Sequence, residues 1–352
     1  MTPQLPPVDI VIANYNYVAY VGDAIASALT QDHPGVRVVV VDDGSTDGSL
    51  EVIGRFAPRV RIHARENGGQ GAAINDGFAV GDGAVVIFLD ADDVLDPSAA
   101  RRVAETFGVD PSLSRVQYRL RVIDAAARPT GEVKPPLGTA MPAGDLRPYL
   151  IAGSLDLPWL PMSGNAFARR ALDGLMPMPE RDYRILADSY LVHLAPVAGP
   201  VAFLEEVLGS YRVHGANSHE RAGLDLEHVR RTIVVAQTTI RDLRDAASAR
   251  GASPRGPREE AVSDLAHRLI SLRLDPTRHP RKGDRRVGLA HAGVRCSLSR
   301  RDIGFPRRVG LATWFGVMWA APRPIARAAA TALLDPARRN AVASRMRRPW
   351  TS

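Results

Sequence analysis

Three carboxylates directly follow an apolar run in the N-terminal third of the chain. Val85–Leu89 contains no polar residue, and Asp90, Asp92 and Asp93 come next. An apolar run of this length predicts a buried strand, and ligands of open α/β sheets bind outside the carboxyl ends of such strands. Because crowded carboxylates repel one another unless a cation lies among them, the segment favours a metal site. The alternative is an acidic turn exposed to solvent.

A second acidic turn follows Val36–Val41, which is rich in β-branched residues and predicts another strand. Asp42 and Asp43 end this strand, so their carboxylates can accept hydrogen bonds from the ring N–H of a pyrimidine base or from ribose hydroxyls. The alternative is a helix start, since Asp47 is a good N-cap. Both interpretations can hold at once, with Asp43 facing a ligand and Asp47 facing the helix.

Two further loops carry residue types suited to binding a nucleotide. Tyr15, after a strand predicted at Val8–Ile12, could lay its ring on a base, while a buried tyrosine at a strand end is the equal alternative. Asn67 opens a glycine-rich loop, and glycines beside a helix start let backbone amides approach a phosphate. Most glycine-rich loops are only turns, so this loop alone is weak support.

These residues lie where predicted strands and helices alternate. Hydrophobic periodicity distinguishes the two kinds of element, and their alternation implies a parallel sheet with right-handed crossovers. The strands are predicted at Val8–Ile12, Val36–Val41, Val60–His63 and Ala84–Leu89, and the helices at Val18–Leu29, Asp47–Arg55 and Gly71–Val80, with one more beginning at Pro97.

The rest of the chain has a different pattern. Prolines are frequent between Val116 and Val213, where a short helix is predicted at Asp188–Leu194. We expect an α/β domain over residues 1–220 and a mainly helical, basic extension over residues 221–352. Within the extension, helices are predicted at Leu224–Arg250, Glu259–Leu274 and Val287–Ser299.

Composition narrows the class of protein. The 352 residues are 45% hydrophobic, enough for a real core, and the net charge is +7. The single cysteine, Cys296, excludes a disulfide framework and a cysteine-based metal site, and it fits a reducing compartment. Met1–Pro7 shows no signal-peptide pattern, and no stretch approaches the roughly 20 apolar residues that span a bilayer. A cytoplasmic location is therefore expected.

The basic extension suggests a peripheral contact with the inner face of a membrane. Aromatic residues flanked by arginines suit a helix in the interface of an anionic membrane, but a core-packing or partner-binding helix is the equal alternative. No nucleic-acid partner is expected, because an aromatic platform or groove-reading motif is missing. The segment in question is Val309–Ala321, with Trp314, Phe315, Met318 and Trp319, flanked by Arg307, Arg308, Arg323 and Arg327, and followed by the basic run Arg338–Arg348.

Four motifs together resemble a known family. Ala13–Asn16, Val39–Asp47, Asn67–Asn75 and Phe88–Asp93, in this order, are similar to motifs of the family 2 glycosyltransferases of the GT-A fold. The resemblance covers roughly the first 215 residues. It implies an α/β GT-A fold, in which a nucleotide-binding α/β half carries a mixed central sheet, followed here by a C-terminal helical extension.

The resemblance implies a role for each acidic turn. Asp43, with Asp42 beside it, would contact the base, and Asp90 and Asp92 would engage the ribose and a divalent cation, Mn²⁺ or Mg²⁺. The cation would offset the charge that develops on a departing nucleoside diphosphate. The implied donor-binding residues are Ala13, Tyr15, Asp42, Asp43, Asn67, Asp90 and Asp92, and the implied metal ligands are Asp92, Asp93 and His214.

Inverting sugar transfer also needs a general base for the acceptor hydroxyl. The resemblance places it at Asp188, where the family usually has Glu-Asp; here Ala187 replaces the Glu, which weakens the prediction for acceptor contacts. An N-cap is the structural alternative for Asp188, and Asp182 is the competing base. The segment Ser163–Phe167, with Gly164 and Asn165, resembles the floor of the acceptor side, where a glycine permits close approach of a sugar.

The sequence therefore predicts an inverting, metal-dependent glycosyltransferase that moves a sugar from a nucleotide-sugar donor, expected to be a UDP-sugar, to a glycan or other hydroxyl acceptor. Synthesis of a surface polysaccharide or glycoconjugate is the expected process. A loop within Asp124–Asp145 is expected to exclude water. The alternatives are a non-catalytic nucleotide-sugar-binding protein and a nucleotidyltransferase, whose glycine-rich, lysine-bearing loop is not present at Ala13–Asn16.

Overall fold

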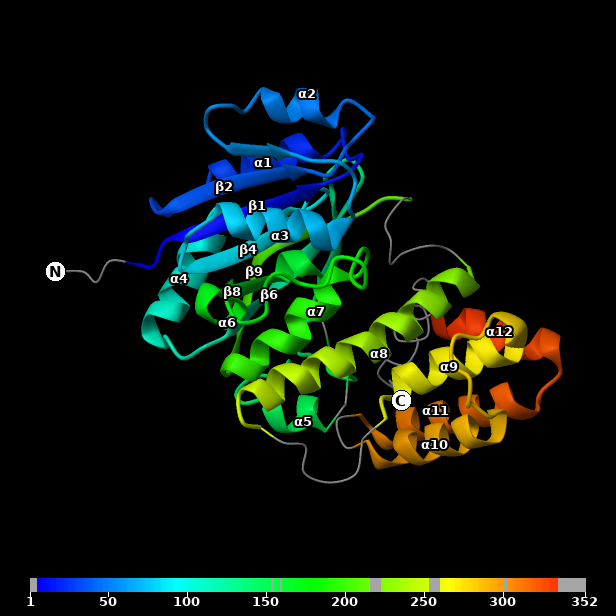
Figure 1. The fold of residues 1–352 in the computed structure, drawn as a ribbon. Helices are drawn as coiled ribbons and strands as arrows, with labels where there is room; N and C mark the ends of the chain where they lie inside the picture. Colours follow the sequence, from blue (N-terminus) through cyan, green and yellow to red (C-terminus); the bar gives the residue numbers. More distant parts are fainter. Residues whose placement is uncertain are drawn as a thin grey trace, which may run out of the picture. The chain divides into compact units, whose positions relative to one another are not determined.

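The chain divides into two compact units (Figure 1). The computed structural model describes residues 5–152, 155–158, 160–215, 223–252, 260–300 and 303–334. The sequence predicts a boundary at residue 220, whereas this division falls after Val213 and returns residues 239–254 to the first unit. The first, here called the sheet unit, comprises Met1–Ile151, Leu157–Val213 and Thr239–Pro254, and the second, the helical unit, comprises Ala152–Asp156, His214–Thr238 and Arg255–Ser352.

A mixed sheet forms the centre of the sheet unit. The strand order is β3-β2-β1-β4-β8-β6-β9-β5, and β7 pairs with β6. Strands β1 to β4 pair in parallel, whereas β8 is antiparallel to both β4 and β6, which confirms the predicted mixed sheet. The strands are β1 (Val8–Asn14), β2 (Val36–Asp42), β3 (Arg61–Ala64), β4 (Val85–Asp90), β5 (Val94–Leu95), β6 (Arg115–Asp124), β7 (Pro129–Lys134), β8 (Asn165–Ala168) and β9 (Val201–Val213).

Helices cover both faces of the parallel strands. Ile10 and Ile12 of β1 belong to a core shared with α1 and α4, whereas Val11 faces α3, where a Cβ added to Gly77 would lie 2.2 Å from Val11 Cγ1. Burial on both faces explains why these strands are continuous apolar runs in the sequence. The helices are α1 (Val21–Leu29), α2 (Ser49–Gly54), α3 (Gln70–Val80), α4 (Ala99–Val109), α5 (Arg147–Ile151), α6 (Arg169–Leu172), α7 (Ala187–Leu194) and the second half of α8 (Leu226–Ala249).

The parallel register brings three strand ends together. Asn14, the last residue of β1, pairs with Asp42 of β2, and Ala13 pairs with Asp90 of β4. The polar residues that follow these strands therefore share one edge of the sheet, where ligands of α/β folds bind.

The helical unit has a core of its own. Leu265, Leu269, Phe315 and Met318 are buried together, and Gly293 permits close contact, because a Cβ there would lie 2.2 Å from the Phe315 ring. No helix in the described ranges is both long and apolar enough to cross a bilayer. Besides the first half of α8, the helices are α9 (Val262–Leu274), α10 (Arg286–Ser299), α11 (Phe305–Ala320) and α12 (Arg323–Leu334).

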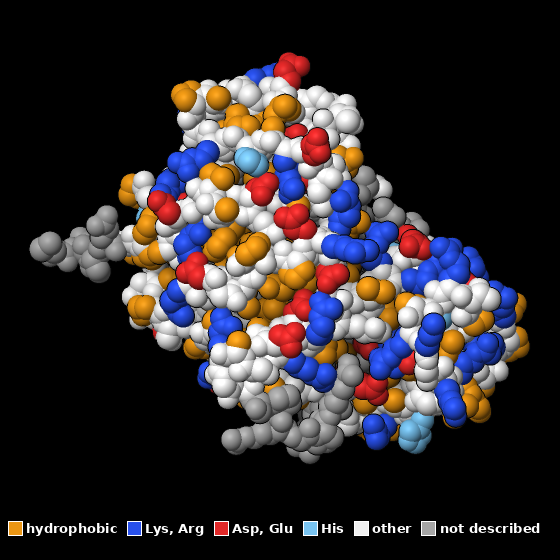
Figure 2. Space-filling model, in the orientation of Figure 1, with side chains coloured by type: hydrophobic (Ala, Val, Ile, Leu, Met, Phe, Trp, Pro, Cys, Tyr) orange, Lys and Arg blue, Asp and Glu red, His pale blue; other side chains and the backbone are white. Residues whose placement is uncertain are grey.

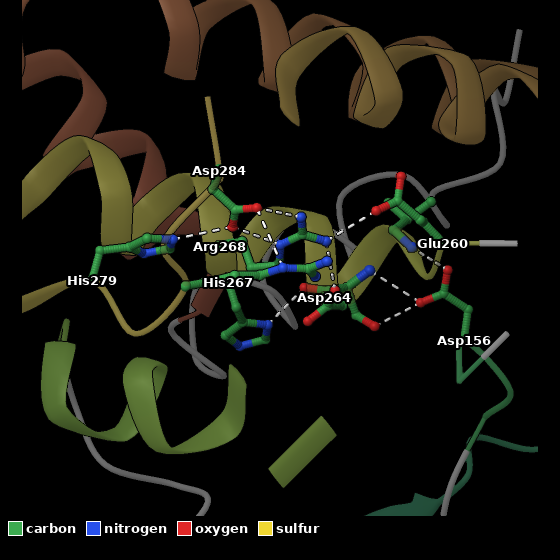
Figure 3. Close-up of polar contacts among 10 residues, drawn as sticks. Asp156, Glu260, Asp264, His267, Arg268, His279 and Asp284 are labelled. Atoms are coloured by element: carbon green, nitrogen blue, oxygen red, sulfur yellow. Dashed lines mark hydrogen bonds and ion pairs between the residues drawn. The ribbon is translucent and has the colours of Figure 1, made fainter. Parts of the chain in front are cut away.

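A charged cluster lies inside the helical unit, around Arg268 of α9 (Figure 3). The Arg268 guanidinium donates to Asp284 at 2.8 and 2.6 Å, to Glu260 at 3.0 Å and to Asp264 at 3.1 Å. His279 Nε2 contacts Asp284 at 3.1 Å. One buried cation thus joins carboxylates from α9 and from the loop before α10. Because the guanidinium fills the centre of the cluster, its role is structural.

Candidate active site

Asp42, the last residue of β2, begins the acidic turn that follows this strand. Its buried carboxylate accepts hydrogen bonds from Asn14 Nδ2 at 2.8 Å, from Ser45 Oγ at 2.6 Å and from the Ser45 amide at 3.0 Å. Asp47 accepts from the amide of Ser49, the first residue of α2, at 2.9 Å. Asp42 therefore shapes the turn. Asp47 bonds a first-turn amide of α2, but the N-cap of this helix is Gly48, so the N-cap interpretation for Asp47 is wrong.

Asp43, the predicted base-reading residue, is also buried, and it holds the glycine-rich loop. Its carboxylate accepts hydrogen bonds from the amides of Gly68 and Gly69 at 2.8 and 2.7 Å, and from Asn67 Nδ2 at 3.1 Å. The two glycine amides that suggested a phosphate site are thus bonded to a carboxylate of the protein. The same contacts bring Asn67, another predicted donor-binding residue, beside Asp43.

The acidic turn after β4 is the second part of the site. Asp92 and Asp93 are buried, and Asp90 is half-buried. Arg212 of β9 fixes this turn, because its amide donates to Asp93 Oδ1 at 2.9 Å and its Nε donates to the Asp92 carbonyl at 2.7 Å. Ser163, which precedes β8, accepts a hydrogen bond from the Asp90 amide at 3.1 Å through its Oγ.

The carboxylates of this turn alter one another's ionisation. Burial, and then the charges of Asp92 and Asp188, raise the pKa of Asp90 to about 8. Burial, and then the charges of Asp92 and Asp90, raise the pKa of Asp93 well above its usual range. Within the described part of the chain, Asp93 Oδ2 is buried and has no hydrogen-bond partner. Such crowding is relieved by a proton or by a bound cation.

Hard oxygen donors of this kind fit Mg²⁺ or Mn²⁺. Among the residues that the structure describes, no three or more Asp, Glu, His or Cys side chains converge as a complete metal site. Asp92 and Asp93 would therefore supply part of a coordination shell, as in Mg²⁺ sites that share the ion with substrate phosphates. His214, the third predicted ligand, directly follows β9 and is half-buried.

Tyr15 and Tyr17 follow β1 and have different surroundings. Burial, and then the charges of the three aspartates after β4, raise the pKa of Tyr17 above its usual range, so its hydroxyl lies near that turn. Tyr15, the predicted stacking residue, is 46% exposed, which leaves its ring accessible. Ala13 lies in the sheet, paired with Asp90.

The predicted base, Asp188, lies in the first turn of α7. It is half-buried, and its charge contributes to the raised pKa of Asp90, so these two carboxylates lie near each other. The N-cap of α7 is Leu186, so the N-cap alternative for Asp188 is wrong. Asp182, the competing base, is exposed and forms an ion pair with Arg241 at 3.0 Å.

Gly164 and Asn165, the predicted acceptor residues, are buried just before and within β8. Asn165 Nδ2 donates to the Pro161 carbonyl at 2.8 Å. A Cβ added to Gly164 would lie 3.2 Å from the Tyr118 carbonyl oxygen. Both residues therefore support the neighbouring Ser163 from within the fold, and their part in acceptor binding stays a prediction.

The segment expected to act as a lid, Asp124–Asp145, is bonded to the sheet at several points. Its central part is β7, which pairs with β6. The buried Arg119 donates to the carbonyls of Pro135 and Pro136 at 2.7 and 3.0 Å, and Gly144 forms a β-bridge with Val201. A freely opening lid would not carry these bonds, so the segment behaves as part of the scaffold.

Four residues near the site were not among the predicted site residues: Tyr17, Gln70, Ser163 and Arg212. Gln70 Nε2 donates to Asp90 Oδ1 at 3.4 Å, and Ser163 begins the segment that resembles the acceptor floor. Ser163 and Arg212 reach their partners Asp90 and Asp92 across 73 and 120 residues of sequence. Such contacts leave no local pattern. The one available signal is that Arg212 stands two residues before the predicted ligand His214.

Comparisons with known proteins agree with this geometry. Residues 9–129 match a family model described as Glycosyl transferase family 2. An uncharacterized glycosyltransferase of Nostoc sp. is 36% identical over 221 residues, which are 61% of this chain and 67% of that protein. The chondroitin synthase of Pasteurella multocida is 37% identical over 116 residues, 32% of this chain and 12% of the synthase. The succinoglycan biosynthesis protein ExoO of Rhizobium meliloti is 39% identical over 104 residues, 29% of this chain and 30% of that protein.

The chain thus spans two thirds of the Nostoc relative but only a small part of the other two. Among solved structures, S. aureus TarS 1–349 in complex with UDP-GlcNAc matches with a TM-score of 0.52 and 15% identity, over 95% of this chain and 92% of that one. At this identity the likeness shows the fold alone. Together these findings confirm the fold and the enzyme class predicted from the sequence: the chain belongs to glycosyltransferase family 2, with the GT-A fold.

Proposed function

We propose that this glycosyltransferase is inverting and metal-dependent, and that it moves a sugar from a UDP-sugar to a hydroxyl acceptor. The observation that carries the proposal is the nearness of Asp188 to the acidic turn after β4: Gln70 contacts both Asp90 Oδ1, at 3.4 Å, and the amide of Ala187, the residue before Asp188, at 3.3 Å. A carboxylate able to take a proton thus stands beside carboxylates suited to a cation. Asp90 ends a parallel strand, at the sheet edge where α/β folds bind ligands.

In the proposed step, Asp188 acts as the general base. Its carboxylate takes the proton of the acceptor hydroxyl while that oxygen attacks the anomeric carbon of the donor sugar. The bond between the anomeric carbon and the diphosphate oxygen breaks in the same displacement, and UDP leaves with the electron pair of that bond. Attack opposite to the leaving group inverts the configuration at the anomeric carbon.

The base of the donor is assigned to Asp43, with Asp42 shaping the turn beneath it. A carboxylate has about four acceptor positions, and the hydrogen bonds from Asn67, Gly68 and Gly69 take three of them at Asp43. The fourth position is on Oδ1, which also lies 3.7 Å from Arg65 Nε, and we assign it to the ring N–H of a pyrimidine. The further donor contacts in this proposal come from Ala13, Tyr15 and Asn67 on the base side and from Asp90 and Asp92 on the ribose and diphosphate side.

We assign the cation, Mn²⁺ or Mg²⁺, to Asp92 and Asp93, with further oxygens from the diphosphate of the donor. His214 stays a predicted third ligand. When bound, the cation would offset the negative charge that develops on the departing diphosphate. The unbonded Asp93 Oδ2 is the best-suited oxygen, because the Arg212 amide already fixes the other oxygen of that carboxylate. The Arg212 amide thereby orients the Asp93 carboxylate before a cation binds.

Synthesis of a surface polysaccharide or glycoconjugate is the proposed process. Its support comes from two relatives, a chondroitin synthase and a succinoglycan biosynthesis protein. The S. aureus neighbour was solved with UDP-GlcNAc, which makes this nucleotide sugar the first donor to test. Gly164 and Asn165 are assigned to the acceptor side through their support of Ser163.

A donor panel tests this function directly. UDP-Glc, UDP-Gal, UDP-GlcNAc, UDP-GlcA and GDP-Man are offered with Mn²⁺, and nucleotide release is measured with and without 4-nitrophenyl glycosides as acceptors. Acceptor-dependent release of UDP that stops with EDTA is the expected result. Thermal stabilisation by a donor without any release would favour a nucleotide-sugar-binding protein instead. Pyrophosphate release from UTP and a sugar 1-phosphate would favour a nucleotidyltransferase.

We also propose that the helical unit contacts the surface of an anionic membrane. Residues 303–334 carry four arginines and no acidic residue, and Lys and Arg side chains are frequent over this unit in Figure 2. Phe305, Val309 and Trp319 of α11 are 71%, 40% and 49% exposed, and their spacing places them on one helix face. Exposed aromatic and apolar side chains among arginines suit the interface of an anionic bilayer.

Co-sedimentation with vesicles tests the membrane proposal. The protein is expected to bind vesicles that contain phosphatidylglycerol and not vesicles of pure phosphatidylcholine. Trp319→Ser should weaken binding several-fold, whereas Val287→Ser, which removes a side chain of α10 that is 63% exposed, should not. Binding that ignores lipid charge or the loss of Trp319 would contradict the proposal. A dimer that protects Trp319 without lipid would instead identify a second copy as the partner.

A further inference from the structure

Gln70 joins the acidic turn after β4 to the helix that carries the proposed base. Its Nε2 donates to Asp90 Oδ1 at 3.4 Å, and its Oε1 accepts from the Ala187 amide at 3.3 Å. Ala187 is the first residue of α7, so this oxygen serves an amide that the helix itself leaves without a partner. Both contacts are long for hydrogen bonds, so each contributes little to stability.

The backbone around Gln70 is packed against the segment that leads into α7. The Gln70 amide donates to the Arg184 carbonyl at 2.8 Å. A Cβ added to Gly69 would lie 2.5 Å from that carbonyl oxygen, and one added to Gly71 would lie 2.6 Å from the Tyr183 carbonyl oxygen. Glycines on both sides of Gln70 therefore permit the close approach that brings its side chain between the two parts of the site.

The segment that Gln70 contacts needs outside support. Leu186, the N-cap of α7, has a φ of 68°, which lies in the left-handed region disfavoured for leucine. Its side chain offers no capping group for the helix. The first turn of α7, which carries Asp188, therefore depends on other residues for its position, and Gln70 ties that turn to Asp90.

We propose that Gln70 is a positioning residue, which sets the Asp188 carboxylate relative to the donor-binding turn. This inference rests on the proposed role of Asp188 as the base. Transfer requires the base, the acceptor oxygen and the anomeric carbon to be aligned, and a displacement of about 1 Å can lower a rate on the order of a hundredfold. Gln70 exerts this effect through α7 and needs no contact with the substrate.

Matched variants isolate the effect. Gln70→Met keeps the length of the side chain and removes both contacts. Gln31→Met is the control. Gln31 is also half-buried, its Oε1 accepts from the Ala100 amide in the first turn of α4 at 2.8 Å, and its Nε2 donates to the Asp96 carbonyl at 2.9 Å.

Turnover is measured as acceptor-dependent UDP release from UDP-GlcNAc, or from the donor that the panel identifies, with Mn²⁺. We expect Gln70→Met to lower kcat by about tenfold or more while the donor KM stays within about twofold. Gln31→Met should lower Tm without this loss of kcat. A loss confined to KM, or a kcat loss no larger than that of Gln31→Met, would overturn the inference.

Asp188→Asn separates a failure of this inference from a failure of the proposed base. If Asp188→Asn keeps transfer, the base is elsewhere and the role of Gln70 falls with it. If Asp188→Asn stops transfer but Gln70→Met leaves kcat unchanged, only the role of Gln70 fails. Should Gln70→Met not fold, Gln70→Asn, whose side chain is too short to reach both partners, replaces it with the same expected loss and the same overturning result.

Discussion

At the scale of single residues, the two acidic turns look alike in sequence but are neutralised differently. Asp42 and Asp43 receive hydrogen bonds from their own turn and from the glycine-rich loop. Asp90 and Asp93 instead keep pKa values raised by burial and by neighbouring carboxylates. Asp42 and Asp43 therefore fix the conformation of the turn and the glycine-rich loop. A bound cation would relieve the repulsion at Asp90 and Asp93.

Asp188→Asn is expected to lower kcat by about two to four orders of magnitude, because an amide cannot take the acceptor proton. Binding of UDP with Mn²⁺, measured by calorimetry, should stay unchanged. Asp182→Asn is the control, since Asp182 is exposed and paired with Arg241, and it should keep its activity. Undiminished transfer in Asp188→Asn together with a loss in Asp182→Asn would move the base to Asp182.

Asp92→Ala is expected to abolish transfer without unfolding the protein. The charge of Asp92 raises the pKa of both Asp90 and Asp93, so its removal relieves repulsion and Tm in EDTA should not fall. The rise in Tm that Mn²⁺ gives the wild-type protein should disappear, because a ligand of the ion is lost. An intact Mn²⁺-dependent rise in Tm would exclude Asp92 as a ligand.

The acidic turns could be predicted from the sequence because each one directly follows an apolar strand, and parallel strands end at one edge. Gln70 could not be predicted in the same way. Its side-chain partner Ala187 lies 117 residues away in the sequence. A glutamine at the start of a helix is common and does not by itself indicate such a contact. Arg212 and Ser163 share this property, since their roles arise from contacts between distant segments.

At the scale of elements, α7 matters most, because it carries Asp188 and is fixed at both ends. Gln70 contacts its first amide, and Arg115 donates to the Val192 carbonyl near its last turn at 2.8 Å. Tyr190 of the same helix donates to the Leu175 carbonyl at 2.6 Å. Four predicted strands lie within two residues of β1 to β4, but the four-residue strand β8 is too short to show an alternating pattern.

Acid should loosen α7 through His193. Burial, with a smaller contribution from the charge of Arg115, lowers the pKa of His193 to about 3, whereas an unfolded histidine titrates near about 6.5. Between these values the unfolded chain binds a proton that the folded chain does not. The contribution of His193 to the free energy of unfolding should therefore fall as the pH drops through this range, by up to about 1.4 kcal/mol per pH unit. Asp90 and Asp93 act in the opposite direction, because their raised pKa values mean that the folded chain binds protons that the unfolded chain does not.

Urea unfolding at several pH values between about 7 and about 4 measures this slope. The free energy of unfolding of His193→Gln should fall less, or rise more, than that of the wild-type protein as the pH drops, because the group that binds the extra proton in the unfolded chain is gone. His291→Gln is the control, since that side chain is exposed on α10, and it should leave the slope unchanged. Equal slopes in His193→Gln and the wild-type protein would show that other groups cause the acid sensitivity.

Gly69→Ala should damage the junction between α3 and α7. Gly69 has a φ of 95°, and its added Cβ would lie 2.3 Å from Arg184 Cγ and 2.5 Å from the Arg184 carbonyl oxygen. Gly131→Ala is the control, because its φ is 85° and an added Cβ would meet nothing within 4 Å. Gly69 has a ψ of 173°, which with its φ lies in a region almost restricted to glycine, so a greater loss of Tm and kcat in Gly69→Ala measures the backbone strain and the contact together. Equal effects would contradict its importance.

At the scale of the whole molecule, the sequence predicts a basic helical extension but not what stabilises it. The buried Arg268 binds Asp284, Glu260 and Asp264 in one cluster (Figure 3). The cluster joins α9 to the loop before α10, and no sequence motif predicts it. The aromatic segment of α11 likewise serves two purposes, since Phe315 is buried in the core while Trp319 is exposed.

Arg268→Met should destabilise the helical unit by about 3–5 kcal/mol, because it removes the counter-charge that three buried or half-buried carboxylates share and leaves Asp284 with Arg281 at 3.6 Å. Hydrogen exchange of α9 and α10 measures this loss within the unit. Arg55→Met is the control, since Arg55 is 67% exposed in its ion pair with Glu51 and should contribute less than about 1 kcal/mol. Binding of UDP with Mn²⁺ should survive in Arg268→Met, because the acidic turns belong to the sheet unit. Equal protection of α9 in both variants would mean that apolar packing alone maintains the helical unit.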